Sequence, residues 1–443
     1  MFSHHISTHK FVFDKHMSAV GLEELVTNIK ILKNLQKMLI SILECEESQI
    51  SCEMEKLRRF MKECSITNNF SLYEGFLRIF VHVSIYFFTS KNDSRYHRFY
   101  IILDELLSNF SLRNVFNRST LFFIFKKNKH FILFLYDKGI IDLSMIKAEI
   151  SSFFRSRHVS HFFPFFIPEI REEYPEFFEK YVYTRHISQK EIDLHYISSG
   201  DIENNLETNV FPNSQKIEKK LRRKTDIRNE IHSNEEITQI IREDNLDKFI
   251  NLVSCQENFD INMNIKNSFL ENNDDIWGDN IPCHIDRVNL LDYTLAFGSI
   301  NIFRYLWLNK ANYLQNSLDY AIIGGNFEII HILEEESHFQ FSIDNYIKSL
   351  QYHRSEISKY FETVLDIQLI FPQIWSMFLK VSNFNIFHKC FINNETNLAQ
   401  ILTEHMFKKN HVNFYIFHHF ICQQPSFDIN SNTNVFLYKS LLS

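Results

Sequence analysis

Apolar positions recur every three to four residues along most of the first 185 residues. Leu22, Leu25 and Ile29 begin this pattern, and such spacing is typical of a helix with one buried face. Further helical stretches are expected at 54–64, 72–88, 99–110, 113–125, 132–138 and 143–154. The pattern therefore predicts an N-terminal helical domain over residues 21–185, preceded by a polar tail over residues 1–20.

Two segments interrupt this helical pattern. The aromatic run His161–Ile167 carries Pro164 and is followed by Pro168. Because proline removes a backbone donor and ends helices, this run is expected to be a packed extended segment. Residues 186–232 are rich in Ser, Asn, Glu and Lys, which predicts a polar linker.

From residue 233 onward the chain repeats itself. Leu291-Asp292-Tyr293 returns as Leu318-Asp319-Tyr320, with glycine seven residues after each leucine and apolar residues nine, eleven, twelve and fifteen after it. A repeat of about 28 residues is typical of a stacked array. Weaker copies begin at Ile237, Tyr346, Trp375 and Thr403. The array is expected over residues 233–433, with a polar insertion at 267–288 and a partial copy at 434–443.

Each copy is interpreted as two short antiparallel helices around a turn. Gly298 and Gly325 suit the positive φ of such a turn, which a Cβ makes costly. Asp244, His353 and Asn410 occupy the same place in other copies, and these residue types tolerate positive φ better than most. One hairpin cannot bury both of its apolar stripes, so stacking of neighbours into an α-solenoid is expected.

These copies carry a resemblance to a known family. Leu318-Asp319-Tyr320-Ala321 through Gly325 resembles the ankyrin pattern T-P-L-H-x-A followed by glycine, and Asn309–Asn312 resembles its closing signature. The run LLDYTLAFGSINIFRYLWLN, then SLDYAIIGGNFEIIHILE and QYHRSEISKYF, resembles the large family of ankyrin-like trichomonad proteins that carry a conserved domain of unknown function. LQKMLISILE and FFPFFIPEIREEYPEFF are similar to that family's leader region.

The resemblance implies an all-α protein whose N-terminal helical domain is followed by an ankyrin-like solenoid. Three features depart from ankyrin repeats: the copies are shorter, the proline is missing, and Asp292 and Asp319 replace the histidine. These departures imply that the β-finger between ankyrin repeats is shortened or absent.

An array of this kind predicts a scaffold or adaptor that binds an unidentified protein partner. The residues expected on its concave, partner-binding face are Arg242, Glu243, Phe297, Ile323, Gln351, Tyr352, Lys380, Lys408 and Lys409. Aromatic side chains beside mixed charges are typical of binding surfaces. The alternative for Phe297 and Tyr352 is that they pack against the next copy.

Composition supports an all-α interpretation and narrows the function. With 8 Gly and 7 Pro, the chain has little material for sheet turns or phosphate-binding loops, and 46 Phe are expected to fill the core. A net charge of −7 predicts no nucleic-acid partner. Seven cysteines without CxxC spacing predict reduced thiols in an intracellular, cytoplasmic protein. The apolar run 76–88 is too short for a bilayer, so no membrane span is expected.

No catalytic, cofactor or metal motif stands out, so no enzyme, cofactor or small-molecule substrate is expected. A solvated acidic loop is favoured over a metal site for Asp274, Asp275, Asp279, His284 and Asp286. Packing within the repeats is favoured over zinc for His411, His418, His419 and Cys422.

Two alternatives stay open. One is an enzyme with an unrecognised site in the N-terminal helical domain. The other is a nuclear or membrane-surface adaptor that uses the basic cluster at 216–224, KIEKKLRRK.

Overall fold

The computed structural model describes residues 19–87, 95–153, 160–187, 226–277, 288–367 and 381–392. Within these ranges every regular element is a helix, and β-pairing is confined to an isolated bridge between Asn264 and Asn289. The described part of the chain is therefore all-α, as predicted. Contacts between Cα atoms divide the chain into two compact units, a first with residues 1–38, 56–76 and 369–443 and a second with 39–55 and 77–368.

The N-terminal helices follow the predicted apolar periodicity. They are α1 (Ala19–Glu44), α2 (Ile50–Glu63), α3 (Phe70–Tyr86), α4 (His97–Ser108), α5 (Leu112–Val115), α6 (Arg118–Phe125), α7 (Lys129–Asp137) and α8 (Leu143–Ser152). The stretch predicted as one helix at 113–125 is divided between α5 and α6. Asn117 causes the division, because its side chain accepts a hydrogen bond from the backbone of Thr120 (2.7 Å) and so starts a new helix.

The extended segment expected at 161–167 was a wrong prediction. This region forms α9 (Phe162–Phe165) and α10 (Ile167–Glu173), and α11 (Pro175–Arg185) follows. Its prolines lie in the first turns of these helices. The backbone N–H groups of a first turn have no intrahelical acceptor, so proline costs little there.

Phenylalanine fills the core of the second unit, as predicted. Phe131 lies fully buried at its centre, stacked on Phe80 with ring centroids 5.2 Å apart. Phe99 and Phe125 contact the same ring at 5.9 and 6.1 Å. Burying each of these side chains contributes about 1.5–3 kcal/mol of transfer free energy, so this cluster is a major source of stability for the N-terminal helices.

The first unit contains a turn that is held by one buried amide. Gln36 of α1 donates from Nε2 to the Ser382 carbonyl (2.9 Å), and its Oε1 accepts from the Phe384 backbone (2.8 Å). Phe384 begins α24 (Phe384–Ile392), at the position of the second helix expected for the copy that starts at Trp375. Both polar ends of the amide are therefore satisfied inside the core.

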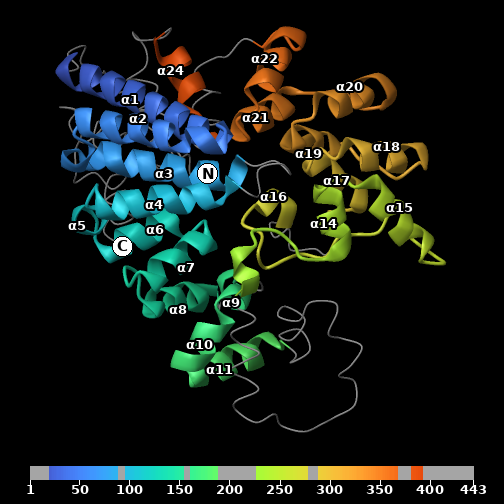
Figure 1. Ribbon diagram of the computed structural model, residues 1–443, viewed down its shortest axis with the longest axis horizontal. Coiled ribbons are helices and arrows are strands. Elements are labelled where there is room, and N and C mark those ends of the chain that lie inside the picture. The colour runs from blue at the N-terminus through green and yellow to red at the C-terminus, as the bar shows by residue number, and fades with distance from the viewer. Residues whose placement is uncertain are drawn as a thin grey trace, which may run out of the picture. The chain divides into compact units, whose positions relative to one another are not determined.

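Four pairs of helices follow one another between residues 236 and 364 (Figure 1). They are α14 (Glu236–Arg242) with α15 (Leu246–Ser254), α17 (Leu290–Ala296) with α18 (Ile300–Leu308), α19 (Ser317–Gly324) with α20 (Phe327–Glu336), and α21 (Ile343–Gln351) with α22 (Ser355–Val364). The first helices pack on one another in chain order, from α14 to α17, α19 and α21. The second helices α15, α18 and α20 do the same.

The turn inside each pair has the backbone conformation that the sequence predicts. Gly298 and Gly325 have φ of 63° and 71°, and Asp244 and His353 have φ of 49° and 55°. Ser382, at the same place in the next copy, has φ of 46°. Asn410 lies outside the described residues. The prediction of positive φ is thus confirmed wherever the structure describes the turn.

Side chains that follow these turns tie each pair to the one before it. Each donates a hydrogen bond to a carbonyl in the last turn of the preceding first helix or in the tight turn that follows it, where carbonyl groups lack intrahelical donors. The bonds run from Ser299 Oγ to Ile241 (2.6 Å), from Asn326 Nδ2 to Gly298 (3.1 Å) and from Arg354 Nε to Ile323 (3.1 Å). The contact between pairs therefore satisfies the helix ends.

Gly324 marks the closest approach between two pairs. A Cβ at this position would overlap the Leu295 carbonyl oxygen and lie 2.7 Å from the backbone nitrogen of Gly298. The obstructing atoms belong to the backbone and cannot rotate away. Helices α17 and α19 can therefore pack this tightly only because residue 324 has no side chain.

We expect Gly324→Ala to lower the free energy of unfolding by at least about 3 kcal/mol, because the added methyl group must force α17 and α19 apart. Gly139→Ala is the matched control. Gly139 has φ of 67° and nothing near its Cβ position, so it should lose only the ~1 kcal/mol of left-handed backbone strain. Urea unfolding followed by circular dichroism measures both variants, and equal losses would contradict the close-approach argument.

Candidate interaction site

The residues expected on the concave face are distributed between the core and the surface. Phe297, Ile323 and Tyr352 are buried. Arg242 and Gln351 are half-buried and Glu243 is exposed, while Lys380, Lys408 and Lys409 lie outside the described residues. A partner could therefore reach the three buried side chains only if this packing opened.

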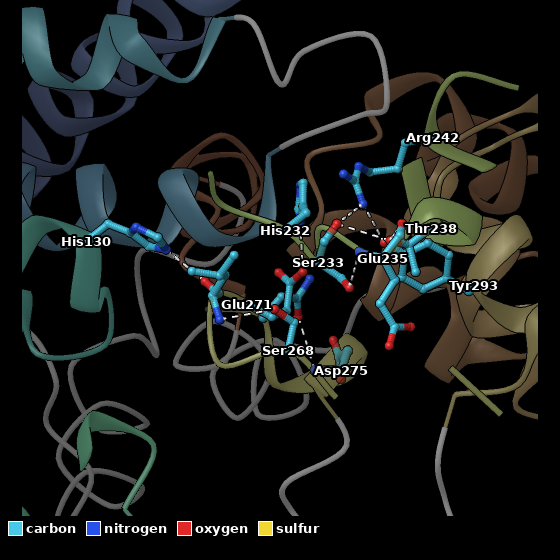
Figure 2. Close-up of polar contacts among 12 residues, drawn as sticks. His130, His232, Ser233, Glu235, Thr238, Arg242, Ser268, Glu271, Asp275 and Tyr293 are labelled. Atoms are coloured by element: carbon cyan, nitrogen blue, oxygen red, sulfur yellow. Dashed lines mark hydrogen bonds and ion pairs between the residues drawn. The ribbon is translucent and has the colours of Figure 1, made fainter. Parts of the chain in front are cut away.

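Arg242 is committed to contacts inside the chain (Figure 2). Its Nη1 donates to the Ser233 carbonyl (2.9 Å) and to the Tyr293 hydroxyl (3.0 Å). Its guanidinium also lies 5.9 Å from the ring centroid of Phe297. These contacts hold the segment before α14 against α17, so Arg242 serves the packing of two neighbouring pairs.

The described half of the insertion is part of the core. Phe269 and Leu270 are buried, and the polar residues Glu271 and Asn273 are only 6% and 1% exposed. A short helix, α16 (Asp274–Trp277), follows them. The solvated loop expected here was a wrong prediction for residues 269–273, whose polar groups have partners within the protein, whereas Asn267 and Asp274 are exposed.

One partner of this segment is the start of α7. The buried Lys129 donates from Nζ to the Glu271 carbonyl, and its backbone donates to Asn272 Oδ1 (3.2 Å). His130 Nε2 lies 2.7 Å from the Leu270 carbonyl oxygen (Figure 2). Burial lowers the pKa of His130 to about 3. The ring is therefore neutral at physiological pH and can donate from one nitrogen.

A second partner is the segment that leads into α14. His232 Nδ1 lies 2.7 Å from Glu271 Oε2, and both side chains are buried (Figure 2). The His232 ring meets that of Phe297 edge-on, with centroids 5.1 Å apart. Glu271 thus connects the insertion to α14 and α17 at once.

A third partner of the insertion is Tyr352, at the end of α21. Its hydroxyl lies 3.0 Å from Asn273 Oδ1, 2.8 Å from Asn273 Nδ2 and 2.7 Å from Asp275 Oδ2. Lys348 Nζ also reaches Asp275 Oδ2 (3.1 Å), and the Tyr86 ring packs edge-on against Tyr352 at 5.3 Å. Burial raises the pKa of Tyr352, so the hydroxyl stays protonated and can donate.

These contacts make residues 268–276 the polar centre of the second unit. Sequence reasoning missed this role, since it assigned no function to Lys129 or His130. The sequence did contain a sign of this role. Lys129 and His130 lie inside an apolar helical stretch, and charged residues in such a stretch are normally paired when they are buried. Their partners, at Leu270 and Glu271, could not be inferred from local spacing.

The acidic residues considered for a metal do not gather into a site in the described ranges. Asp275 pairs with Lys348, and no group of three or more potential ligands with metal-binding geometry occurs among the described residues. Asp279, His284 and Asp286 lie outside these residues, as do His411, His418, His419 and Cys422. A search of the described helices also finds none long and apolar enough to cross a membrane.

The end of α18 and the loops after α18 and α20 carry five large apolar side chains, which we call the loop-edge surface: Trp307, Leu308, Tyr313, Leu314 and Phe339. Leu308 and Leu314 are 77% and 60% exposed. The three aromatic rings form a chain, with Trp307 at 4.9 Å from Tyr313 and Tyr313 at 5.7 Å from Phe339. Leu308 and Leu314 are therefore the exposed members of this surface, and its three aromatic side chains are half-buried.

The carboxylate of Glu336 borders the loop-edge surface. Glu334, Glu335 and Glu336 at the end of α20 are all exposed. Trp307 Nε1 donates to Glu336 Oε2 (2.7 Å), which fixes one carboxylate beside the aromatic rings. The patch therefore combines apolar contact area with negative charge.

Comparisons with known proteins find no relative of this chain: no family model, no curated protein and no solved structure matches it. The resemblance to ankyrin-like trichomonad proteins therefore stays a prediction from the sequence.

The aspartates of the two L-D-Y motifs face the following pair. Asn345 Nδ2 donates to Asp319 Oδ1 (2.7 Å), and the Ser317 hydroxyl donates to Asp292. Asp292 is buried, and its Oδ1 has no hydrogen-bond partner among the described residues. Burial consequently raises the pKa of Asp292 to about 6.

Because the pKa of Asp292 is raised in the folded chain, its ionised form lowers the free energy of unfolding. The folded chain favours the protonated carboxyl, so stability from this group is present below pH ~4 and is lost as pH rises to ~6. We expect Asp292→Asn to raise the free energy of unfolding by about 2 kcal/mol at pH 7.5 and by almost nothing at pH 4. Denaturant unfolding at both pH values measures the difference. Asp344→Asn, which changes an exposed carboxylate, should give no stabilisation at either pH. If Asp292→Asn stabilised the chain equally at both pH values, the raised pKa of Asp292 would not be the cause.

Removing the Tyr352 hydroxyl should weaken the polar centre. Tyr352→Phe leaves the buried Asn273 amide without its partner, which costs about 1–3 kcal/mol. Tyr360→Phe is the control, because the Tyr360 hydroxyl bonds the exposed Glu334 (2.5 Å), and its loss should cost less than about 0.5 kcal/mol. Thermal unfolding of the two variants compares them, and an unchanged melting temperature for Tyr352→Phe would show that this hydrogen bond adds no stability.

Proposed function

We propose that this chain is a non-catalytic scaffold whose ankyrin-like solenoid of helical pairs binds a protein partner. The stacking of the pairs in chain order supports the solenoid, as does the positive φ at each described turn. In such an array each unit contacts only its neighbours, which leaves a long edge available for binding. The short loops between pairs agree with a reduced or missing β-finger.

The observation that carries this proposal is the loop-edge surface. Monomeric proteins rarely expose contiguous apolar patches without a function, and Trp and Tyr are the residue types that dominate binding energy at interfaces. Leu308 and Leu314 are among the most exposed large apolar side chains of the described ranges. Of the residues expected to bind, Phe297, Ile323 and Tyr352 are buried, so the loop-edge surface is the better candidate.

The charge around the patch indicates the chemistry of the partner. Trp307 holds Glu336 beside the aromatic rings, and the whole chain is acidic, with a net charge of −7. Complementary charge speeds association and excludes partners of the same sign. The favoured partner is therefore a protein segment that combines lysine or arginine with large apolar residues.

A cytoplasmic location is part of the same proposal. Cys45, Cys52, Cys64 and Cys255, the cysteines whose state the structure describes, are free thiols. Free thiols are typical of reducing compartments. The nuclear and membrane-surface alternative depends on residues 216–224, which lie outside the described residues.

Site-specific photo-crosslinking in the full chain tests the proposal. A benzophenone amino acid at the position of Leu314 should yield covalent adducts with a partner protein, while the same group at Ile101, an exposed position of α4, should not. Excess wild-type chain should compete for the adduct. A Leu308→Ser, Leu314→Ser double variant should compete about tenfold or more less well, since it lacks the central apolar contacts.

Two results would count against the scaffold as proposed. One is the same set of adducts from both positions, which indicates nonspecific capture. The other is competition by the double variant that equals that of the wild type, which shows that the partner binds elsewhere.

A further inference from the structure

A cleft of about 580 Å³ opens in the second unit, away from the loop-edge surface. One wall is α7, whose residues His130, Leu133, Phe134 and Asp137 line it. Their spacing places them on one face of that helix. The start of α4 and residues 228–231 form the other walls. A volume of this size is in the range of small-ligand sites.

Aromatic rings dominate the side of the cleft where α4 meets α7. Tyr96 and Tyr100 line it from α4 and Phe134 from α7. The Tyr100 ring lies 5.4 Å from Phe134 and 5.8 Å from Tyr96. Burial raises the pKa of both tyrosines, so their hydroxyls stay protonated and the rings carry no charge. The Asn128 amide fixes one of them by donating to the Tyr96 hydroxyl (2.8 Å).

The charges that line the cleft leave an excess of negative charge. Arg228 is already neutralised, since its guanidinium pairs with Glu169 at 2.7 Å. Asp137 and Glu230 also line the cleft. Unlike Arg228, neither of these carboxylates makes an ion pair or hydrogen bond with any of the described residues. Partial desolvation raises the pKa of Asp137, and the charge of Arg228 opposes this shift.

We propose that this cleft binds an alkylated ammonium group, which the rings of Tyr100 and Phe134 contact and which Asp137 neutralises. Cations lie favourably over aromatic faces, and cages of aromatic rings are a common way to recognise quaternary ammonium groups. Lys138 Nζ, which pairs with Asp104 (2.7 Å), lies 5.1 Å from the Phe134 ring centroid, so this ring already has a cation at its edge or face. An anionic ligand would meet Asp137 and Glu230 with no free cation in the lining to offset them.

A catalytic role for the cleft has less support. The lining residues include no serine, threonine or cysteine that would serve as a nucleophile. Both ring nitrogens of His130 face backbone carbonyls, at Leu270 (2.7 Å) and Arg228 (3.2 Å). The imidazole is therefore occupied as a structural group.

Titration of the full chain with choline tests the proposal. Its neutral carbon isostere, 3,3-dimethylbutan-1-ol, has the same shape without the charge. Choline should bind at about 10 mM or tighter by calorimetry, and at least about fivefold more tightly than the isostere, because only the cation gains from the rings and the carboxylate. A short peptide with one trimethyl-lysine separates the two sources of this chemistry: tighter binding of the peptide indicates a modified protein, and tighter binding of choline indicates a small metabolite.

Variants locate the site. Phe134→Leu and Asp137→Asn should each weaken choline binding about threefold or more. Their matched controls are Phe123→Leu and Asp344→Asn, which change an exposed phenylalanine and an exposed aspartate outside the cleft and should leave binding unchanged. Asp137 is exposed, so Asp137→Asn should fold like the wild type. Its effect on choline binding can therefore be interpreted even if Phe134→Leu lowers the melting temperature.

Three outcomes would overturn the proposal. They are equal affinity for choline and its isostere, no binding of choline or the peptide at tens of millimolar, and wild-type affinity in both cleft variants.

Discussion

The backbone contact between α17 and α19 sets the spacing on which the rest of the array depends. Gly324 lets these helices approach until only a hydrogen atom fits between residue 324 and the Leu295 carbonyl. At this spacing the Asn326 amide reaches the Gly298 carbonyl, and the Ser317 hydroxyl reaches Asp292. A wider separation would break both contacts and leave buried polar groups without partners, which is more costly than the lost hydrogen bonds alone.

Much of the helical array could be predicted from the sequence, because its constraints are local. A tight turn between two helices requires one residue with positive φ, and Gly298, Gly325, Asp244 and His353 are residue types that accept it. The prediction failed at Pro164 and Pro168 for an equally local reason. Proline ends a helix that precedes it but is well tolerated in a first turn, and residue types alone do not say which case applies.

The polar centre of the second unit could not be predicted, because its constraints join distant parts of the chain. Glu271 and Asn273 look like residues of a solvated loop until His232, Lys129 and Tyr352 are placed around them. The same holds for the candidate binding face. An aromatic residue at the end of a helix, such as Phe297, is exposed or buried according to what packs over it, and here His232 and Arg242 do so.

The way in which side chains are buried with partners or left exposed also bears on function. Buried polar contacts such as Glu271 with His232 add little net stability compared with an apolar core, yet they allow only one arrangement of the helices they join. A chain that fixes its interior in this way holds its surface groups in defined positions. The informative groups are then those that the described residues leave exposed or without a hydrogen bond: Leu308 and Leu314 on the loop edge, and Asp137 and Glu230 in the aromatic cleft. These are the groups through which the two proposed binding sites would act, because a complementary molecule could cover the leucines and pair with the carboxylates.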